Sequence, residues 1–393
     1  MCCVRPSRLG RPPRIVFPAR TGLLATLLFA STVSAATFDL EEADPGAWFR
    51  LEYVNLWVSH ASLPAPLVTT GDASSLGRLG FAQTRTLLGP GQLAAPVFPA
   101  LRLTLGGWME DEVFGGEVSV FATALRATHF SAASDVQGSP LLAIPFEDVT
   151  SGTPHESSLV LSQPGAASGG VWTDDAASLF GLELDGLGNL TEYLPGNRAT
   201  LTLLGGFRLL AFRERFRLSS DTSRPAMLPV SFNDTFLADD TFIGPEIGLR
   251  GGYRYRRWTI QGTAKAAIGG TLSTVYESPQ ASISFVAPRI QAFPDRGWFV
   301  QPSNTGREYH RALSVVPAAQ IRVGYDLTAR LRLTIGYEAF YWTRMLRAPN
   351  QIDRQLNLSQ AVGPLVGPSR PAELHKFSNF WAQGFTVGLQ FNY

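Results

Sequence analysis

The last ten residues of the chain alternate strictly between apolar and polar positions. The apolar positions are Phe385, Val387, Leu389, Phe391 and Tyr393, and glycine, threonine, glutamine or asparagine stands before each of them. Successive side chains of a strand point to opposite sides, so a period of two separates these residues onto two faces. The pattern predicts a strand with one apolar face and one polar face.

The same alternation recurs upstream and predicts about ten strands. In one example, Leu331, Leu333 and Ile335 alternate with Arg332 and Thr334. Segments 113–130 and 175–190 fit the pattern more loosely, and 276–298 has room for one more hairpin, so the expected range is eight to twelve strands. The ten segments are 47–58, 99–109, 113–130, 175–190, 198–215, 239–255, 257–275, 311–326, 330–346 and 378–393.

The connections between these segments alternate between short and long. Short turns are expected at Glu110–Glu112, around Pro195–Asn197, at Arg256 and around Leu327–Ala329. Long loops are expected at 59–98, 131–174, 216–238, 276–310 and 347–377. Bacterial outer-membrane barrels sort their connections in this way, with short periplasmic turns and long extracellular loops. A soluble sandwich, the competing interpretation, would pack the apolar faces against each other and has no reason to sort its loops.

The physics of a lipid environment favours a closed ring. Hydrocarbon supplies no hydrogen-bond partners, so a sheet in a membrane cannot leave an open edge. The apolar faces carry no charge along their central stretches, where an arginine would cost about 2–4 kcal/mol. Aromatic residues near the predicted strand ends, among them Tyr341 and Trp342, are expected to form interfacial girdles. We therefore predict an all-β protein, a single antiparallel transmembrane β-barrel.

The N-terminal segment has the features of an export signal. Five arginines precede an apolar run at 21–33, and small residues follow at 34–36. This order predicts a cleaved signal peptide, residues 1–35, and a barrel domain, residues 36–393. Both cysteines, Cys2 and Cys3, belong to the signal, so the mature chain has no disulfide. The net charge changes from +1 to −4, because 33 basic residues less five leave 28 against 32 acidic ones. No basic patch for nucleic acid remains.

Several stretches resemble a known family. They include LRLTLGGWMEDE at 101–112, DTFIGPEIGLRGGYRYRRW at 240–258 and FWAQGFTVGLQFNY at 380–393. Together with 49–58, 63–71, 201–210 and 301–353 they resemble β-barrel porin family seven, an outer-membrane β-barrel family of planctomycete-type bacteria. The resemblance implies the barrel fold and a place in the bacterial outer membrane after export through the inner membrane. It implies no catalytic or ligand-binding residues.

If the apolar faces meet lipid, the alternate positions face the lumen and carry charges of both signs. This leaves two functional hypotheses: passive passage of small hydrophilic solutes through a narrow lumen, or a closed structural or surface-interaction barrel whose long extracellular loops bind a partner. The candidate lumen-lining residues are Arg50, Glu52, Arg102, Glu117, Arg208, Glu246, Arg250, Lys265, Arg322, Arg332 and Glu338, with Glu183 beside them.

The sequence contains no recognisable catalytic motif. The five histidines, His60, His129, His155, His310 and His375, lack metal-site spacing and are interpreted as scattered surface residues. We expect no enzymatic activity, no cofactor, no metal and no nucleic acid. The expected partners are outer-membrane lipid, small polar solutes, and the barrel assembly machinery, which would read the C-terminal strand ending in Phe391 and Tyr393. We expect a monomer.

Overall fold

The computed structural model describes residues 46–59, 61, 63–91, 97–110, 112–191, 198–284, 290–293 and 296–393. They belong to one compact unit, Asp44–Tyr393. The predicted signal peptide lies outside the described residues, so cleavage after residue 35 stays a prediction. The described segments contain no helix that is long and apolar enough to cross a membrane.

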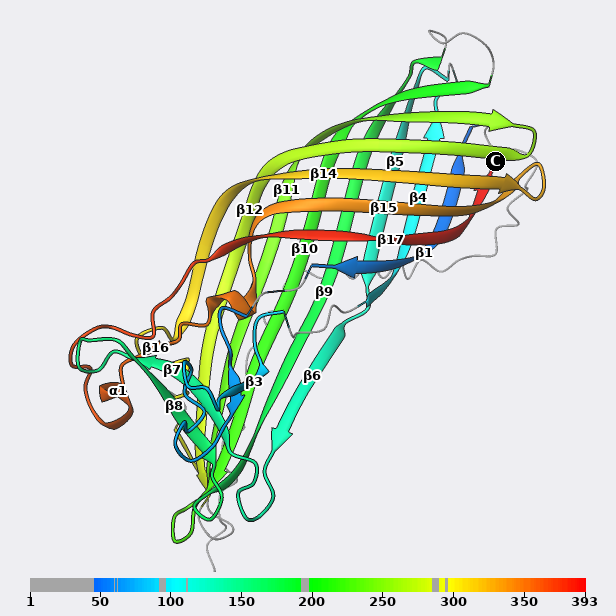
Figure 1. Ribbon diagram of the computed structural model, residues 1–393. Helices are drawn as coiled ribbons and strands as arrows, with labels where there is room; N and C mark the ends of the chain where they lie inside the picture. Colours follow the sequence, from blue (N-terminus) through cyan, green and yellow to red (C-terminus); the bar gives the residue numbers. More distant parts are fainter. Residues whose placement is uncertain are drawn as a thin grey trace, which may run out of the picture. The chain divides into compact units, whose positions relative to one another are not determined.

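Ten antiparallel strands in the described part of the chain form one closed ring (Figure 1). The last strand pairs with the first, and the ring closes through the pairing of β9 with both β5 and β10. In ring order the strands are β9 (Ser168–Asn189), β10 (Ala199–Ser223), β11 (Val230–Tyr255), β12 (Trp258–Ser284), β14 (Gly306–Asp326), β15 (Leu331–Leu346), β17 (Phe377–Asn392), β1 (Trp48–Val58), β4 (Val97–Trp108) and β5 (Phe114–Thr123).

The ring confirms the predicted fold class, because each of the ten predicted segments contributes one ring strand. Closure gives every ring strand a paired neighbour on both sides, as a membrane sheet requires. The segment 113–130 fits loosely because it is interrupted. β5 and then β6 (Arg126–Ala133) pair in turn with β9.

The predicted loop at 216–238 was wrong. β10 and β11 stay paired from Ala199 and Tyr253 out to Thr222 and Val230, so only 224–229 form the turn. Phe216 and Leu218 continue the inward-facing positions of β10 and are buried beneath the loops. Arginines interleave with them, and that charge hid the strand continuation in the sequence. At 276–298, β12 extends outward and pairs with the short β13 (Ile290–Phe293).

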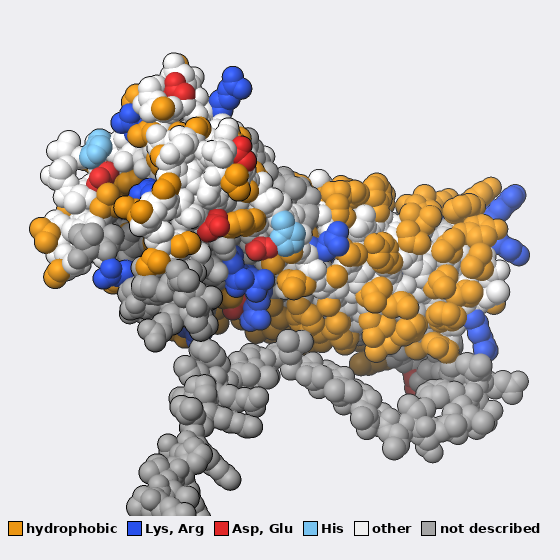
Figure 2. Space-filling model, turned by 90° about the horizontal axis from the view of Figure 1, so that it is seen from below, with side chains coloured by type: hydrophobic (Ala, Val, Ile, Leu, Met, Phe, Trp, Pro, Cys, Tyr) orange, Lys and Arg blue, Asp and Glu red, His pale blue; other side chains and the backbone are white. Residues whose placement is uncertain are grey.

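The outward-facing side chains form an apolar belt around the part of the ring that lies away from the long loops. We call this end of the ring the inner end and the loop-bearing end the outer end. Leu203 and Phe207 on β10, and Ile247 and Leu249 on β11, are among those that stand exposed. Figure 2 shows hydrophobic side chains covering the barrel wall, with Lys and Arg gathered towards its ends. Where the belt ends on β10, the outward positions change to Arg213, which pairs with Asp239. The alternation therefore places apolar side chains on the outside of the ring, as predicted, and charged ones such as Arg208 and Glu246 on its inside.

The long loops fold into a second layer at one end of the ring (Figure 1). Segments from three of them form a small sheet of β2 (Val68–Thr70), β3 (Arg85–Leu88), β7 (Leu142–Asp148), β8 (His155–Ser162) and β16 (Gln355–Leu356). Phe146 and Leu356 of this sheet share a buried cluster with Phe216 and Phe236 of the barrel wall. The chain 347–376 adds a 3-10 turn, η2 (Ala348–Gln351), and one helical turn, α1 (Ser359–Val362). The loops therefore pack on the wall through a core of their own.

Candidate functional site

The interior of the ring is organised in layers, because the inward positions of each strand change character along its length. On β1 the inward side chains run from Trp48 through Arg50 and Glu52 to Val54, Leu56 and Val58. β4 shows the same order in reverse, from Phe98 and Ala100 to Arg102 and Thr104. Neighbouring strands repeat these steps in register, so side chains of one kind gather at one depth.

The structure brings ten of the eleven sequence-predicted lumen residues into one layer, together with Glu183 and Asp185. All twelve are buried or half-buried. The eleventh, Arg332, lies nearer the inner mouth, where its Nε donates to Asp326 Oδ1 at 2.6 Å. We call the twelve residues the charged layer: Arg50, Glu52, Arg102, Glu117, Glu183, Asp185, Arg208, Glu246, Arg250, Lys265, Arg322 and Glu338.

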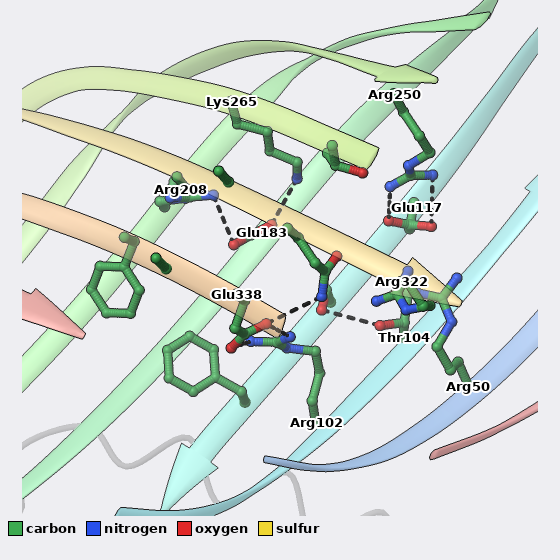
Figure 3. Close-up of a pocket in the computed structure, with 18 of the residues that line it drawn as sticks. Arg50, Arg102, Thr104, Glu117, Glu183, Arg208, Arg250, Lys265, Arg322 and Glu338 are labelled. Atoms are coloured by element: carbon green, nitrogen blue, oxygen red, sulfur yellow. Dashed lines mark hydrogen bonds and ion pairs between the residues drawn. The ribbon is translucent and has the colours of Figure 1, made fainter. Parts of the chain in front are cut away.

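Several ion pairs of the charged layer cross the lumen, whereas Arg208 pairs along the wall with Glu183 and Glu246 on its two neighbouring strands (Figure 3). Arg102 of β4 forms a two-pronged pair with Glu338 of β15, with Nη2 to Oε1 at 2.6 Å. In the ring order two strands separate these partners. Such ion pairs run through the interior of the ring, so their side chains fill the lumen.

The other cross-lumen pairs follow the same rule. Arg250 Nη2 of β11 reaches Glu117 Oε1 of β5 at 2.7 Å, and Lys265 Nζ of β12 reaches Glu183 Oε2 of β9 at 2.7 Å. In each case two strands again lie between the partners. Arg322 of β14 pairs with Glu52 of β1 at 3.1 Å in the same way.

Among the described residues, the charged layer holds six basic and six acidic side chains. The signs are interleaved, so no ring of one sign is present that would select cations or anions. Burying a charge costs free energy unless a partner compensates it, which explains why nearly every group here has an opposite charge within reach. The cavity left between these side chains has a volume of about 70 Å³, room for a few water molecules.

A larger polar cavity lies on the inner side of the charged layer. Its volume is about 240 Å³, and its lining includes Trp48, Trp108, Thr200, Arg332 and Gln390. It shares Arg50, Arg250 and Arg322 with the lining of the smaller cavity. We call it the inner cavity. Water-sized space therefore reaches from this end of the ring as far as the charged layer.

On the outer side of the charged layer the inward positions become apolar. Phe212 packs on Phe380 with ring centroids 4.9 Å apart, and Phe242 packs on Trp342 at 6.2 Å. The Trp342 Nε1 donates to Thr271 Oγ1 at 2.9 Å, which satisfies its polar atom. We call this buried group the aromatic layer. Its other members include Val54, Leu56, Val58, Phe98, Phe121, Leu179, Leu210 and Val316.

The aromatic layer corrects the prediction made for Trp342, and the predicted set of lumen residues did not include it. Trp342 was predicted to stand in an interfacial girdle, but its side chain is fully buried inside the ring. The candidate list for the lumen considered only charged residues, so it omitted Phe212, Phe242 and Phe380. A signal was available: each of these residues occupies an inward position by the same alternation that placed the charges.

A buried ion pair closes the aromatic layer from the loop side. Arg347, just before η2, donates from Nε to Glu214 Oε2 of β10 at 3.0 Å and from Nη1 to the Ser59 carbonyl at 3.1 Å. Its guanidinium lies 5.1 Å from the centre of the Phe212 ring and 5.6 Å from that of Phe380. A cation held over two aromatic faces and against a carboxylate is strongly anchored. The loop segment is thereby fixed across the outer end of the lumen.

A family comparison identifies what kind of barrel this is. The sequence model of the family described as "Putative beta barrel porin-7" matches residues 48–393. The chain belongs to this family. As a barrel porin-7 protein it is a β-barrel of the bacterial outer membrane, and its apolar belt is the surface that meets lipid. None of the curated proteins matches the barrel porin-7 chain in sequence.

Solved structures with some likeness to the barrel porin-7 chain are distant. A FadL homologue of Pseudomonas aeruginosa has 8% identity over 89% of this chain and 90% of its own, with a TM-score of 0.23. The toluene transporter TodX of Pseudomonas putida has 9% identity over 89% and 91%, with a TM-score of 0.15. OmpT of Vibrio cholerae has 9% identity over 90% and 99%, with a TM-score of 0.15. Likenesses this weak carry no argument about function.

Proposed function

We propose that this protein is a closed outer-membrane barrel that holds a folded surface layer at the outside of the cell. The observation that carries the proposal is the aromatic layer. Its rings fill the lumen directly beyond the charged layer, and Arg347 fixes the loop chain above them. A hydrated path through this depth would require these rings to leave a close-packed position, at the full cost of the packing contacts and apolar burial that they lose.

The folded loops support a role for the outer surface. Three long connections contribute strands to one small sheet, and that sheet shares a core with the barrel wall. Loops of this length are often irregular or mobile, and a packed layer is costly in conformational entropy to maintain. A barrel that serves as a rigid support for such a layer explains both the filled lumen and the ordered loops. In this account the layer contacts a partner outside the cell.

Passive passage of small hydrophilic solutes is the second candidate, and the inner cavity favours it. The polar space of about 240 Å³ borders the charged layer, and a narrow ten-stranded barrel would pass only small molecules. Passage would need the aromatic layer and Arg347 to move aside. The two candidates therefore differ in one respect, which is whether water and ions cross the aromatic layer.

Planar-bilayer conductance of the refolded protein separates the two candidates. We expect a silent membrane from protein whose folding is shown by a heat-dependent shift in gel migration, while a wide porin reconstituted in parallel conducts. The variant Phe212→Ser, which places a hydroxyl in the aromatic layer, is compared with Phe207→Ser on the lipid-facing side of the same strand. Stepwise conductance by the folded wild-type protein would overturn the closed-barrel proposal and support solute passage.

A further inference from the structure

Two histidines far apart in the sequence meet at the outer end of β14. Glu308 and His310 both point inward from this strand, and His375 comes from the chain that leads into β17. The two imidazole rings lie with their centroids 4.3 Å apart. The Glu308 Oε2 atom lies 3.2 Å from His310 Nε2 and 3.0 Å from His375 Nδ1. One carboxylate oxygen therefore stands between two ring nitrogens.

These separations are close to those of ligands on a shared metal ion. Zinc holds nitrogen and oxygen donors at roughly 2.0–2.1 Å in a tetrahedron, which places neighbouring donors roughly 3.3 Å apart. Both nitrogen–oxygen distances here, 3.2 Å and 3.0 Å, are near that value. One donor atom from each of the three side chains lies within 4.8 Å of the others. Of the two histidines, His375 is the more exposed.

A fourth donor is at hand. The Glu373 carboxyl group hydrogen-bonds to Glu308. Glu373, Glu308 and His375 line one small cavity among the outer loops. Glu277 lines it too and receives a hydrogen bond from Asn304 Nδ2 at 2.6 Å. Three acidic residues thus share this cavity with His375, and one of them, Glu308, also contacts His310. His375 has a left-handed backbone, φ 45°, which a non-glycine residue adopts only where the surroundings hold it.

The charged layer shows what a similar cluster looks like when the chain itself supplies the cation. The ligand atoms of Glu183, Asp185 and Glu246 lie within 4.8 Å of one another, as do those of Glu308, His310 and His375. Lys265 is inserted among them, with Nζ 2.7 Å from Glu183 and 3.7 Å from Glu246. At β14, by contrast, the ion-pair partners of Glu308 are histidines. Neutral imidazoles offer lone pairs to a cation and do not replace it.

We propose that Glu308, His310 and His375 form a site for a divalent transition metal of the zinc type, with Glu373 as the fourth ligand. Imidazole together with carboxylate suits zinc and its neighbours better than calcium or magnesium, which prefer oxygen alone. The bound ion would join the outer end of β14 to the chain that enters β17. The site lies among the outer loops, so it does not depend on whether the lumen is open.

The test is zinc titration of the full refolded chain, with cobalt as a spectroscopic probe of nitrogen ligation. We expect one zinc per chain, and a cobalt spectrum with intense tetrahedral bands. His375→Ala and His310→Gln should each weaken zinc binding by about tenfold to a hundredfold. The matched control is His155→Ala. His155 is also an outer-loop histidine beside an acid, Asp148 at 3.9 Å, and its removal should leave zinc binding unchanged.

Folding of each variant is checked by its heat-dependent gel shift. His375 lies in a loop, so His375→Ala carries the test even if His310→Gln fails to fold. Absence of stoichiometric zinc binding by the folded wild-type chain would overturn the proposal. Zinc affinity that survives His375→Ala, or that calcium at equal concentration abolishes, would overturn it as well.

Discussion

The charged layer and the aromatic layer fill the same lumen by different physics. In the charged layer, six bases and six acids of the described chain are interleaved, several of them paired across the interior, and a small space of water size remains. In the aromatic layer, Phe212, Phe242, Trp342 and Phe380 exclude water by packing. Ion pairs can exchange partners or admit water at modest cost, whereas close-packed rings cannot. We therefore infer that the aromatic layer seals the lumen, whereas the charged layer fixes the strand register and fills the interior.

The aromatic layer should be the more costly of the two to break. Trp342→Ala is expected to reduce the free energy of unfolding by about 5 kcal/mol, because it empties a large buried volume and leaves Thr271 without its donor. The measurement is urea unfolding in phospholipid vesicles, followed by gel shift. Trp381→Ala, on the lipid-facing side of β17, is the control and should cost clearly less. Equal losses for the two variants would argue against a tightly packed interior.

The charged layer should respond to removal of one partner more strongly than to removal of both. Arg102→Met leaves Glu338 buried without its pair, at an expected cost of about 3 kcal/mol. Adding Glu338→Met should restore most of the stability, since an apolar pair of similar volume needs no compensation. The same urea titration serves for both variants. If the double variant is as unstable as the single one, the ion pair of Arg102 and Glu338 stabilises the barrel by more than the cost of desolvating its two charges.

The two faces of the barrel wall should differ in their tolerance of charge. Ile247→Arg on the lipid-facing side of β11 should cost about 2 kcal/mol, as expected for an arginine in the lipid region. The inward neighbour Glu246 shows that charge is accepted one position away when Arg208 lies at 3.1 Å. Unfolding titrations in vesicles of matched thickness report the difference. A harmless Ile247→Arg would mean that this position lies outside the lipid belt.

Ion pairs outside the lumen should matter least. Arg213 and Asp239 pair at 2.6 Å on the outer surface, but solvent reaches both side chains. Arg213→Ala is therefore expected to change the free energy of unfolding by less than about 1 kcal/mol. Set beside Arg102→Met, this variant isolates the effect of burial on the same type of bond. A loss of stability as large as that caused by Arg102→Met would show that the pair of Arg213 and Asp239 is shielded from solvent.

The barrel was predictable because its environment repeats along every strand. Lipid outside and polar groups inside impose a period of two, which is legible from segments such as 330–346 and 378–393 without any tertiary information. The extension of β10 beyond residue 215 was hidden, because there the outward face meets water and carries arginines. The apolar signal weakens wherever a strand leaves the membrane.

The lumen was predictable only in part. The alternation identified which side chains point inward, and ten of the charged candidates gather in one layer. Which acid meets which base depends on ring order and strand tilt, and neither is written in local sequence. Aromatic residues on the inward face were overlooked, because Trp342 near a strand end resembles a girdle residue. The meeting of His310 and His375 needs the loop fold and had no sequence signal.

The central claim, that the aromatic layer seals the lumen, is tested most directly by thiol labelling. The predicted mature chain has no cysteine, so single cysteines can be placed at Val316 in the aromatic layer and at Thr200 in the lining of the inner cavity. A small hydrophilic thiol reagent should label Thr200→Cys in the folded protein and leave Val316→Cys unreactive until the barrel is unfolded. Labelling of folded Val316→Cys at a rate similar to that of Thr200→Cys would show that water crosses this depth and would contradict the account.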